Sequence, residues 1–167
     1  DRSRNVDNGG AAIFNSRGTV FVNGSSFSNN LKNLVIRQNN TGDFVDAAIC
    51  SLDGSVFVFN SEFVNNGACY GGAIYSGTSA SSGGAIAGVS PKEVNIADSL
   101  FENNVATQGG AVKFNGGIVG VNNCSFVNNT AEDGGGAIVV NWNGELDVAN
   151  STFVNNSAKN YAAAIYN

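Results

Sequence analysis

Two short motifs recur along the chain and together define a repeat. The first is F-x-N-N, and the second is a tetrad of small residues that ends in Ile or Val. The F-x-N-N motif begins at Phe27, Phe63, Phe101, Phe126 and Phe153, and the tetrads end at Ile13, Ile49, Ile74, Val112, Ile138 and Ile165. Successive phenylalanines are 36, 38, 25 and 27 residues apart, which fits a period of about 26 residues with two insertions. Self-similarity at such a period predicts a solenoid.

The two insertions account for the longer spacings. The first lies near residues 34–43 and the second near residues 77–88. The second insertion carries its own tetrad, Gly83-Gly84-Ala85-Ile86, so either Ile74 or Ile86 can be the member of the stacked row in that turn. The sequence leaves this choice open.

Alternating apolar residues follow each tetrad. In the first turn they are Val20 and Val22, and in the fourth Val119 and Val121. Alternation is typical of a strand with one buried face, and a second short apolar segment around the Phe follows after a bend. Each turn therefore holds three short strands separated by bends. The sequence predicts an all-β, single-domain, right-handed parallel β-helix over residues 1–167, with about five turns.

The asparagine pairs and the tetrad glycines fit the bends of such a coil. Asn tolerates the left-handed backbone region that a bend needs, and stacked amides can bond from one turn to the next. Gly before the tetrad lets the chain turn sharply and approach the next turn closely.

Composition narrows the range of partners and reactions. Charged residues make up 13% of the chain, the net charge is −5 and there is no histidine. Without a basic block, nucleic acid and anionic membranes are poor partners, and no apolar run is long enough to span a bilayer. The outward acids Glu93, Glu145 and Asp147 have no Lys or Arg beside them on the same strand, so we expect a solvated charge pair rather than a catalytic centre.

Two further features have structural interpretations. Glu132-Asp133 is expected to be a polar turn, and no calcium-loop spacing is present. Cys124 occupies a small inward position and is expected to be a buried thiol, whereas a bridge between Cys50 and Cys69 stays open. We predict no catalytic, cofactor or metal residues.

Outward-facing aromatic residues are the strongest sign of a binding surface. Phe21 and Phe57, with Phe59 nearby, occupy outward positions of the middle strand in the first two turns. An exposed apolar patch usually marks a contact, either with a partner or with a lid formed by Leu34–Ile36 of the first insertion. A second outward row, just past each tetrad, consists of Phe14, Cys50, Tyr75, Lys113, Val139 and Tyr166. Its aromatic members, Phe14, Tyr75 and Tyr166, are further candidate partner-binding residues.

The combination of motifs resembles the polymorphic outer-membrane protein repeat of chlamydial autotransporter passengers, and adhesin-like β-helix repeats of archaea and some algae. The segments that match its GGAI half are Gly71–Ile74, Gly109–Val112 and Gly135–Ile138, and the five Phe segments match the other half. The tetrads at Ile13, Ile49 and Ile165 depart from it, since Ala replaces Gly. The resemblance implies a right-handed β-helix on an extracytoplasmic surface, often an adhesin.

We therefore expect a non-enzymatic, adhesin-like binding module, secreted or at a cell surface, or in an organelle lumen if the source is eukaryotic. Its partner is a protein or a cell-surface ligand. One alternative is a structural subunit docked in a larger assembly, because both termini fall inside a repeat and leave open coil ends. The other is a carbohydrate-active β-helix enzyme of the lyase or epimerase type.

Overall fold

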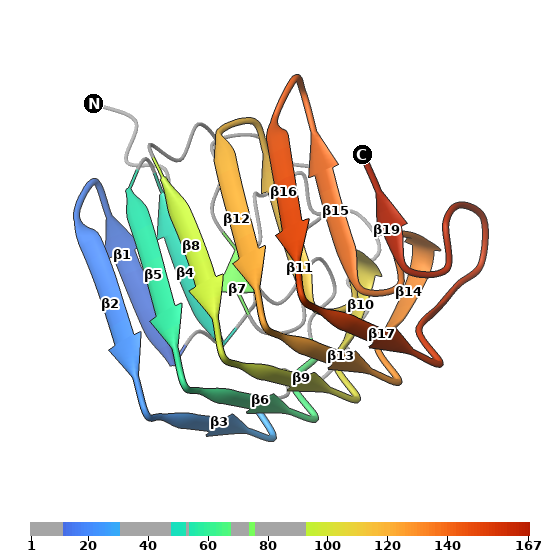
Figure 1. Cartoon of the computed structure of the whole chain (residues 1–167), viewed down its shortest axis with the longest axis horizontal. Coiled ribbons are helices and arrows are strands. Elements are labelled where there is room, and N and C mark those ends of the chain that lie inside the picture. Colours follow the sequence, from blue (N-terminus) through green and yellow to red (C-terminus); the bar gives the residue numbers. More distant parts are fainter. Residues whose placement is uncertain (1–11, 31–47, 53, 68–73, 76–92) are drawn as a thin grey trace, which may run out of the picture.

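The alternating apolar segments form short strands, and each strand pairs with the equivalent strand of the next repeat. The computed structural model describes residues 12–30, 48–52, 54–67, 74–75 and 93–167. Within these ranges all regular structure is β, and the strands fall into four parallel sheets. Figure 1 shows the coils following one another from the blue first strands to the red last ones. The prediction of a parallel β-helix is confirmed, and its right-handedness stays a prediction.

The first sheet contains the tetrad residues. Its strands, in spatial order, are β1 (Ile13–Ser16), β4 (Ile49–Leu52), β7 (Ile74–Tyr75), β11 (Val112–Asn115), β15 (Ile138–Asn141) and β19 (Ile165–Tyr166). Ile74 pairs in register with Ile49 on one side and Val112 on the other. Ile74 is therefore the member of the stacked row, and Ile86 and both predicted insertions lie outside the described residues.

The middle sheet contains the Val-x-Val segments. Its strands, in spatial order, are β2 (Thr19–Asn23), β5 (Ser55–Phe59), β8 (Val94–Ala97), β12 (Ile118–Asn122) and β16 (Glu145–Ala149). A sharp bend connects it to the third sheet, which forms the lower edge in Figure 1. The third sheet consists of β3 (Ser26–Ser28), β6 (Glu62–Val64), β9 (Leu100–Glu102), β13 (Ser125–Val127) and β17 (Thr152–Val154).

A fourth sheet, which the sequence did not predict, lies between the asparagine pair and the tetrad. It consists of β10 (Val105–Gln108), β14 (Thr130–Gly134) and β18 (Ser157–Ala158). Glu132 and Asp133, which were expected to form a polar turn, belong to strand β14. The alternation of apolar and polar residues in this segment is too weak to indicate a strand. The expected three strands per turn are therefore four in the later coils.

Identical residues stack in the core. The Phe rings at its centre lie 4.8–5.0 Å apart between centroids and within 5° of parallel, in the order Phe27, Phe63, Phe101, Phe126 and Phe153. The predicted inward valines and isoleucines of the first two sheets pair in register around them. Burial of these rows provides the main driving force for folding.

The two asparagines of each pair have separate roles. The first adopts the left-handed region, with φ between 52° and 56°, at Asn29, Asn65, Asn103, Asn128 and Asn155. The second points inward and bonds to the equivalent amide of the next coil, as Asn104 does to Asn129 at 3.0 Å. From Asn66 onward each inner amide also donates to the carbonyl of a Phe in the preceding coil, for example from Asn129 to Phe101 at 2.9 Å. The buried amides are thus satisfied, and the predicted amide ladder is confirmed.

Candidate functional site

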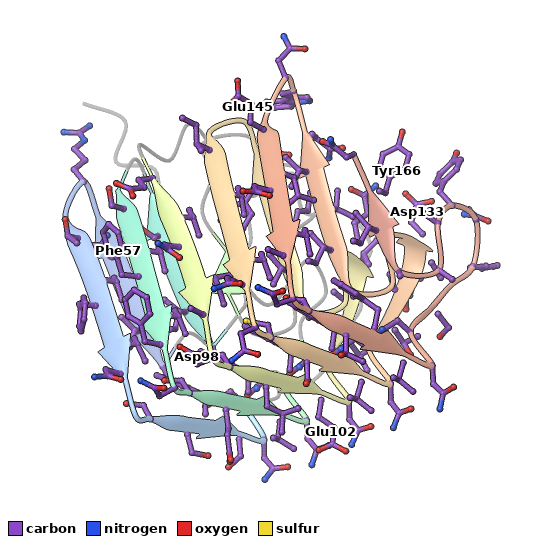
Figure 2. The ribbon with its side chains drawn as sticks, in the orientation of Figure 1. Phe57, Asp98, Glu102, Asp133, Glu145 and Tyr166 are labelled. Carbon is purple, nitrogen blue, oxygen red and sulfur yellow. The ribbon has the colours of Figure 1, made fainter. Side chains whose placement is uncertain are left out.

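Three phenylalanines form an aromatic patch on the outward side of the middle sheet. Phe21 of β2 pairs in register with Phe57 of β5, and the ring of Phe59 lies 5.5 Å from that of Phe21, centroid to centroid. Phe21 is 66% exposed, whereas Phe57 and Phe59 are half-buried. Figure 2 shows Phe57 over the first strands of the sheet. The strand alternation that buries the valines on either side forces these rings outward.

The same outward row becomes polar in the later coils. Asn95 of β8, Gly120 of β12 and Asp147 of β16 continue the row of Phe21 and Phe57. A Cβ at Gly120 would have no atom nearer than 3.9 Å, so the surface is open at that position. The face therefore has an apolar end and a polar end, as the sequence indicated.

The second outward row is partly covered. Lys113 and Val139 pair in register, and each is 1% exposed. A Cβ at Gly109 would lie 3.1 Å from Cβ of Lys113, and a Cβ at Gly135 would overlap Cγ2 of Val139. The glycine turns that precede the tetrads therefore lie against these side chains.

Tyr166 is the described member of this row that stays accessible. It is 45% exposed, and its ring lies 5.8 Å from that of Tyr161, which is 56% exposed. Figure 2 shows Tyr166 at the opposite end of the molecule from Phe57. The side chains of Phe14 and Tyr75, which were also predicted to bind a partner, lie outside the described residues.

A polar cluster of Gln108, Lys113, Asp133 and Asn160 lies beside this row. Nζ of Lys113 donates to Oε1 of Gln108 at 2.7 Å, and Nε2 of Gln108 donates to Oδ2 of Asp133 at 2.6 Å. Nδ2 of Asn160 donates to Oδ1 of Asp133 at 3.0 Å. The cluster links three successive coils, because its members come from β10 and β11, from β14 and from the segment after β18.

Burial and hydrogen bonding shift two pKa values in this cluster in the same direction. Burial lowers the pKa of Lys113 from its ordinary 10.5 to about 7, although the carboxylate of Asp133 opposes that change. Hydrogen bonds from Asn160 and Gln108, with a smaller contribution from Lys113, lower the pKa of Asp133. At neutral pH a large fraction of Lys113 is therefore an uncharged amine beside a carboxylate.

Sequence reasoning did not find this cluster. Lys113 was one polar member of an outward row, and Asp133 was part of an expected turn. One signal was available: the paired glycines at 109–110 and 135–136 indicate that backbone approaches closely, so a long side chain just past the tetrad is covered rather than solvated.

The outward acids are arranged as a solvated group. All three acids lie on or beside the middle sheet and are exposed: Glu93, Glu145 and Asp147. None of the described strands of that sheet carries a Lys or Arg. In the part of the chain that the structure describes, no three His, Cys, Asp or Glu side chains gather as metal ligands.

Cys124 is the buried thiol that the sequence predicted. It is 2% exposed, and its Sγ lies 3.2 Å from the carbonyl oxygen of Asn122. Burial raises the pKa of this thiol to about 11, so it is protonated and unreactive at neutral pH. Equivalent positions hold serines that bond in the same way, such as Ser99 to Ala97. The Cys50 and Cys69 pair lies outside the residues whose side chains are described.

Two segments, residues 60–77 and 123–141, match the Chlamydia polymorphic membrane protein repeat. The chain carries two copies of this repeat. The second copy covers β13, β14 and β15, so one polymorphic membrane protein repeat includes a Phe strand, the fourth-sheet strand and the tetrad strand. Proteins of this repeat family are autotransporter-type surface proteins and are generally not catalytic.

No curated protein and no solved structure matches the chain. Across the described ranges, no helix is long and apolar enough to cross a membrane.

Proposed function

We propose that the chain is a non-enzymatic, adhesin-like binding module that acts outside the cytoplasm. Two copies of a repeat from surface proteins and the parallel β-helix support this proposal. A stack of coils presents long, flat outer faces on a stiff core, which suits recognition of a protein or another cell-surface ligand. The inference on location rests on the repeat family, whose members are outer-membrane or surface proteins.

The aromatic patch carries the proposal. Phe21 exposes 66% of its surface beside two further rings, whereas the same row is polar from Asn95 onward. A purely structural coil has no need for an exposed ring at this position, since Asn, Gly and Asp serve at the equivalent positions of later coils. Exposed apolar patches with polar surroundings are typical of contact surfaces.

A carbohydrate-active enzyme is the weaker candidate. Lyases and epimerases need a proton acceptor and a partner acid or cation in contact with one substrate. The chain has no histidine, and the exposed Glu145 and Asp147 stand on a sheet whose described strands hold no basic residue. We therefore propose that the outward acids keep the surface hydrated and do not catalyse a reaction.

A structural subunit docked in a larger assembly is the second candidate. One observation favours it: Tyr161 and Tyr166 form another exposed aromatic pair, and Tyr166 lies at the opposite end of the molecule from Phe57. A subunit inserted between neighbours would use apolar contacts at both ends, whereas a simple adhesin needs one.

The test is a double substitution, Phe21→Ser with Phe57→Ser. Both side chains point away from the core, so we expect the coil to stay folded and its circular dichroism melting curve to change little. Binding of the fluorescently labelled chain to cultured epithelial cells should fall at least tenfold. Ile118→Ser is the matched control, because Ile118 is 58% exposed on the same sheet but lies away from the patch.

Three results are decisive. Loss of cell binding in the double variant, with Ile118→Ser unchanged, supports the binding module. Unchanged binding together with faster amide exchange in residues 34–43 would show that the patch seats the first insertion, and it would overturn this site. Cell binding lost on Tyr161→Ser with Tyr166→Ser, but not on the Phe variant, would place the contact at the opposite end.

A further inference from the structure

The buried amine of Lys113 faces a carboxamide and a carboxylate. Its Nζ lies 2.7 Å from Oε1 of Gln108, and the C=O bond adds about 1.2 Å, so Cδ of Gln108 is within about 4 Å of the amine. Nε2 of the same carboxamide lies 2.6 Å from Oδ2 of Asp133. An amine, an acyl carbon with its leaving group and a carboxylate that can carry a proton thus lie next to one another.

The surroundings favour reaction between these groups over reaction with an outside molecule. Lys113 is 1% exposed, so no external acyl donor or carbonyl compound reaches its amine. Burial holds the pKa of Lys113 near 7, which makes the nucleophilic, uncharged form abundant at neutral pH. Asn160 and Gln108 keep Asp133 ionised and therefore able to accept a proton.

We propose that Lys113 and Gln108 form an intramolecular amide bond, with Asp133 carrying the proton. The lone pair of Nζ attacks Cδ of Gln108, and a small rotation of the carboxamide brings the two atoms to bonding approach. In the adduct Nζ and Nε2 are bonded to the same carbon, so Asp133, whose Oδ2 lies 2.6 Å from Nε2, takes a proton from Nζ and passes it to Nε2. The Cδ–Nε2 bond then breaks, ammonia leaves, and the Nζ–Cδ amide remains. One amine and one carboxamide thus give one secondary amide and one ammonia, with no oxidant or cofactor.

The product would suit its position. Gln108 ends β10 and Lys113 belongs to β11, so the amide would close the turn that carries Gly109 and Gly110 between the fourth and first sheets. It would also replace a buried amine by a neutral group, which removes the cost of burying a charge. A covalent closure at this turn would stiffen a coil of a protein proposed to work at an exposed surface.

The mass of the intact, denatured chain tests this directly. We expect the purified, folded protein to be lighter than its sequence by one ammonia molecule, and a digest to contain a peptide joined at Gln108 and Lys113. Asp133→Asn should slow formation of the product at least tenfold. Lys159→Arg, a change at an exposed lysine, should leave it intact.

A second variant guards against misreading a failure to fold. Gln108→Glu offers a carboxyl group in place of the carboxamide, so its product should be lighter by one water molecule instead of one ammonia. An unchanged mass in the parent after prolonged incubation at mildly alkaline pH would overturn the proposal. A loss of ammonia that persists in Lys113→Arg would overturn it too, because cyclisation of an asparagine elsewhere would then be its source.

Discussion

At the scale of the residue, the repeat assigns different tasks to neighbouring side chains of one type. Asn128 is exposed and makes the left-handed corner with φ 54°, whereas Asn129 is fully buried. The oxygen of Asn129 accepts from the backbone and side-chain nitrogens of Asn104, each at 3.0 Å. Its nitrogen donates to Phe101 and to Asn156. One side chain therefore satisfies polar groups of the two coils on either side of its own.

Replacing Asn129 by Ala should destabilise the chain by about 3–5 kcal/mol, because several buried donors and acceptors lose their partner at once. The free energy of unfolding, measured by urea titration, checks this. Asn128→Gly is the matched control and should change stability by less than about 0.5 kcal/mol, since Gly readily adopts positive φ. A larger loss of stability from Asn128→Gly than from Asn129→Ala would mean that the inner and outer asparagines are assigned the wrong way round.

At the scale of the element, the turn before each tetrad depends on the absence of a side chain. Gly135 has φ 62°, and a Cβ there would lie 2.6 Å from the carbonyl oxygen of Ile138 and press on Val139. In the last tetrad the equivalent residue is Ala162, which keeps a positive φ of 31°. Non-glycine residues pay a conformational cost in this region.

Gly135→Ala should therefore cost about 2–4 kcal/mol, through both backbone strain and the close contact. Ala162→Gly should do the opposite and stabilise the chain by about 0.5–1 kcal/mol, since it relieves the strained φ. Thermal and urea unfolding of the two variants measure both changes in the free energy of unfolding. A neutral Gly135→Ala would show that the turn does not approach the first sheet as closely as described.

The polar cluster also makes the free energy of unfolding depend on pH in molecules whose Lys113 amine has not reacted. Its pKa is about 7 in the folded chain and 10.5 as an ordinary lysine, so the unfolded chain binds more protons between these values. The free energy of unfolding should then rise with pH across this window, by about 1 kcal/mol per pH unit.

The Asp133→Asn variant isolates this dependence, because we expect its amine to stay unreacted. This variant lacks the carboxylate that raises the pKa of Lys113. The pH range over which its free energy of unfolding rises therefore extends slightly below pH 7. Comparison with Lys113→Met removes the contributions of other titrating groups. If the two variants keep a constant stability difference from pH 7 to 10, the amine is not buried as described.

At the scale of the whole molecule, the order of residues along one coil is repeated in the next. Stacking places equivalent positions of successive coils over one another. The sequence therefore predicts the buried rows that begin at Val20, Val22 and Phe27. The outward position of Phe21 follows from the same alternation. The sequence also predicts that Phe59 lies near Phe21. The 5.5 Å contact between the two rings could not be predicted, because it depends on side-chain rotamers.

Other features could not be predicted, for physical reasons. The fourth sheet pairs segments such as Val105–Gln108 and Thr130–Gly134, whose composition is that of a turn, and the hydrogen bonds that make them strands come from neighbouring coils. The burial of Lys113 depends on how closely two glycine turns pack against the first sheet. Both features arise from contacts between coils rather than from the pattern within one.

The stacking of coils in register is the central claim, and pulsed electron resonance distances test it most directly. Thr19 and Glu145 begin β2 and β16, the outer strands of the middle sheet, and Ser28 and Val154 end β3 and β17 of the third sheet. Each pair is separated by four strand spacings, or about 19 Å. Spin labels at either pair, in a chain whose native cysteines are replaced by serine, should give narrow distributions centred between about 15 and 30 Å. Broad distributions near about 60 Å, as for a flexible segment of this length, or clearly different distances for the two pairs, would contradict the parallel β-helix.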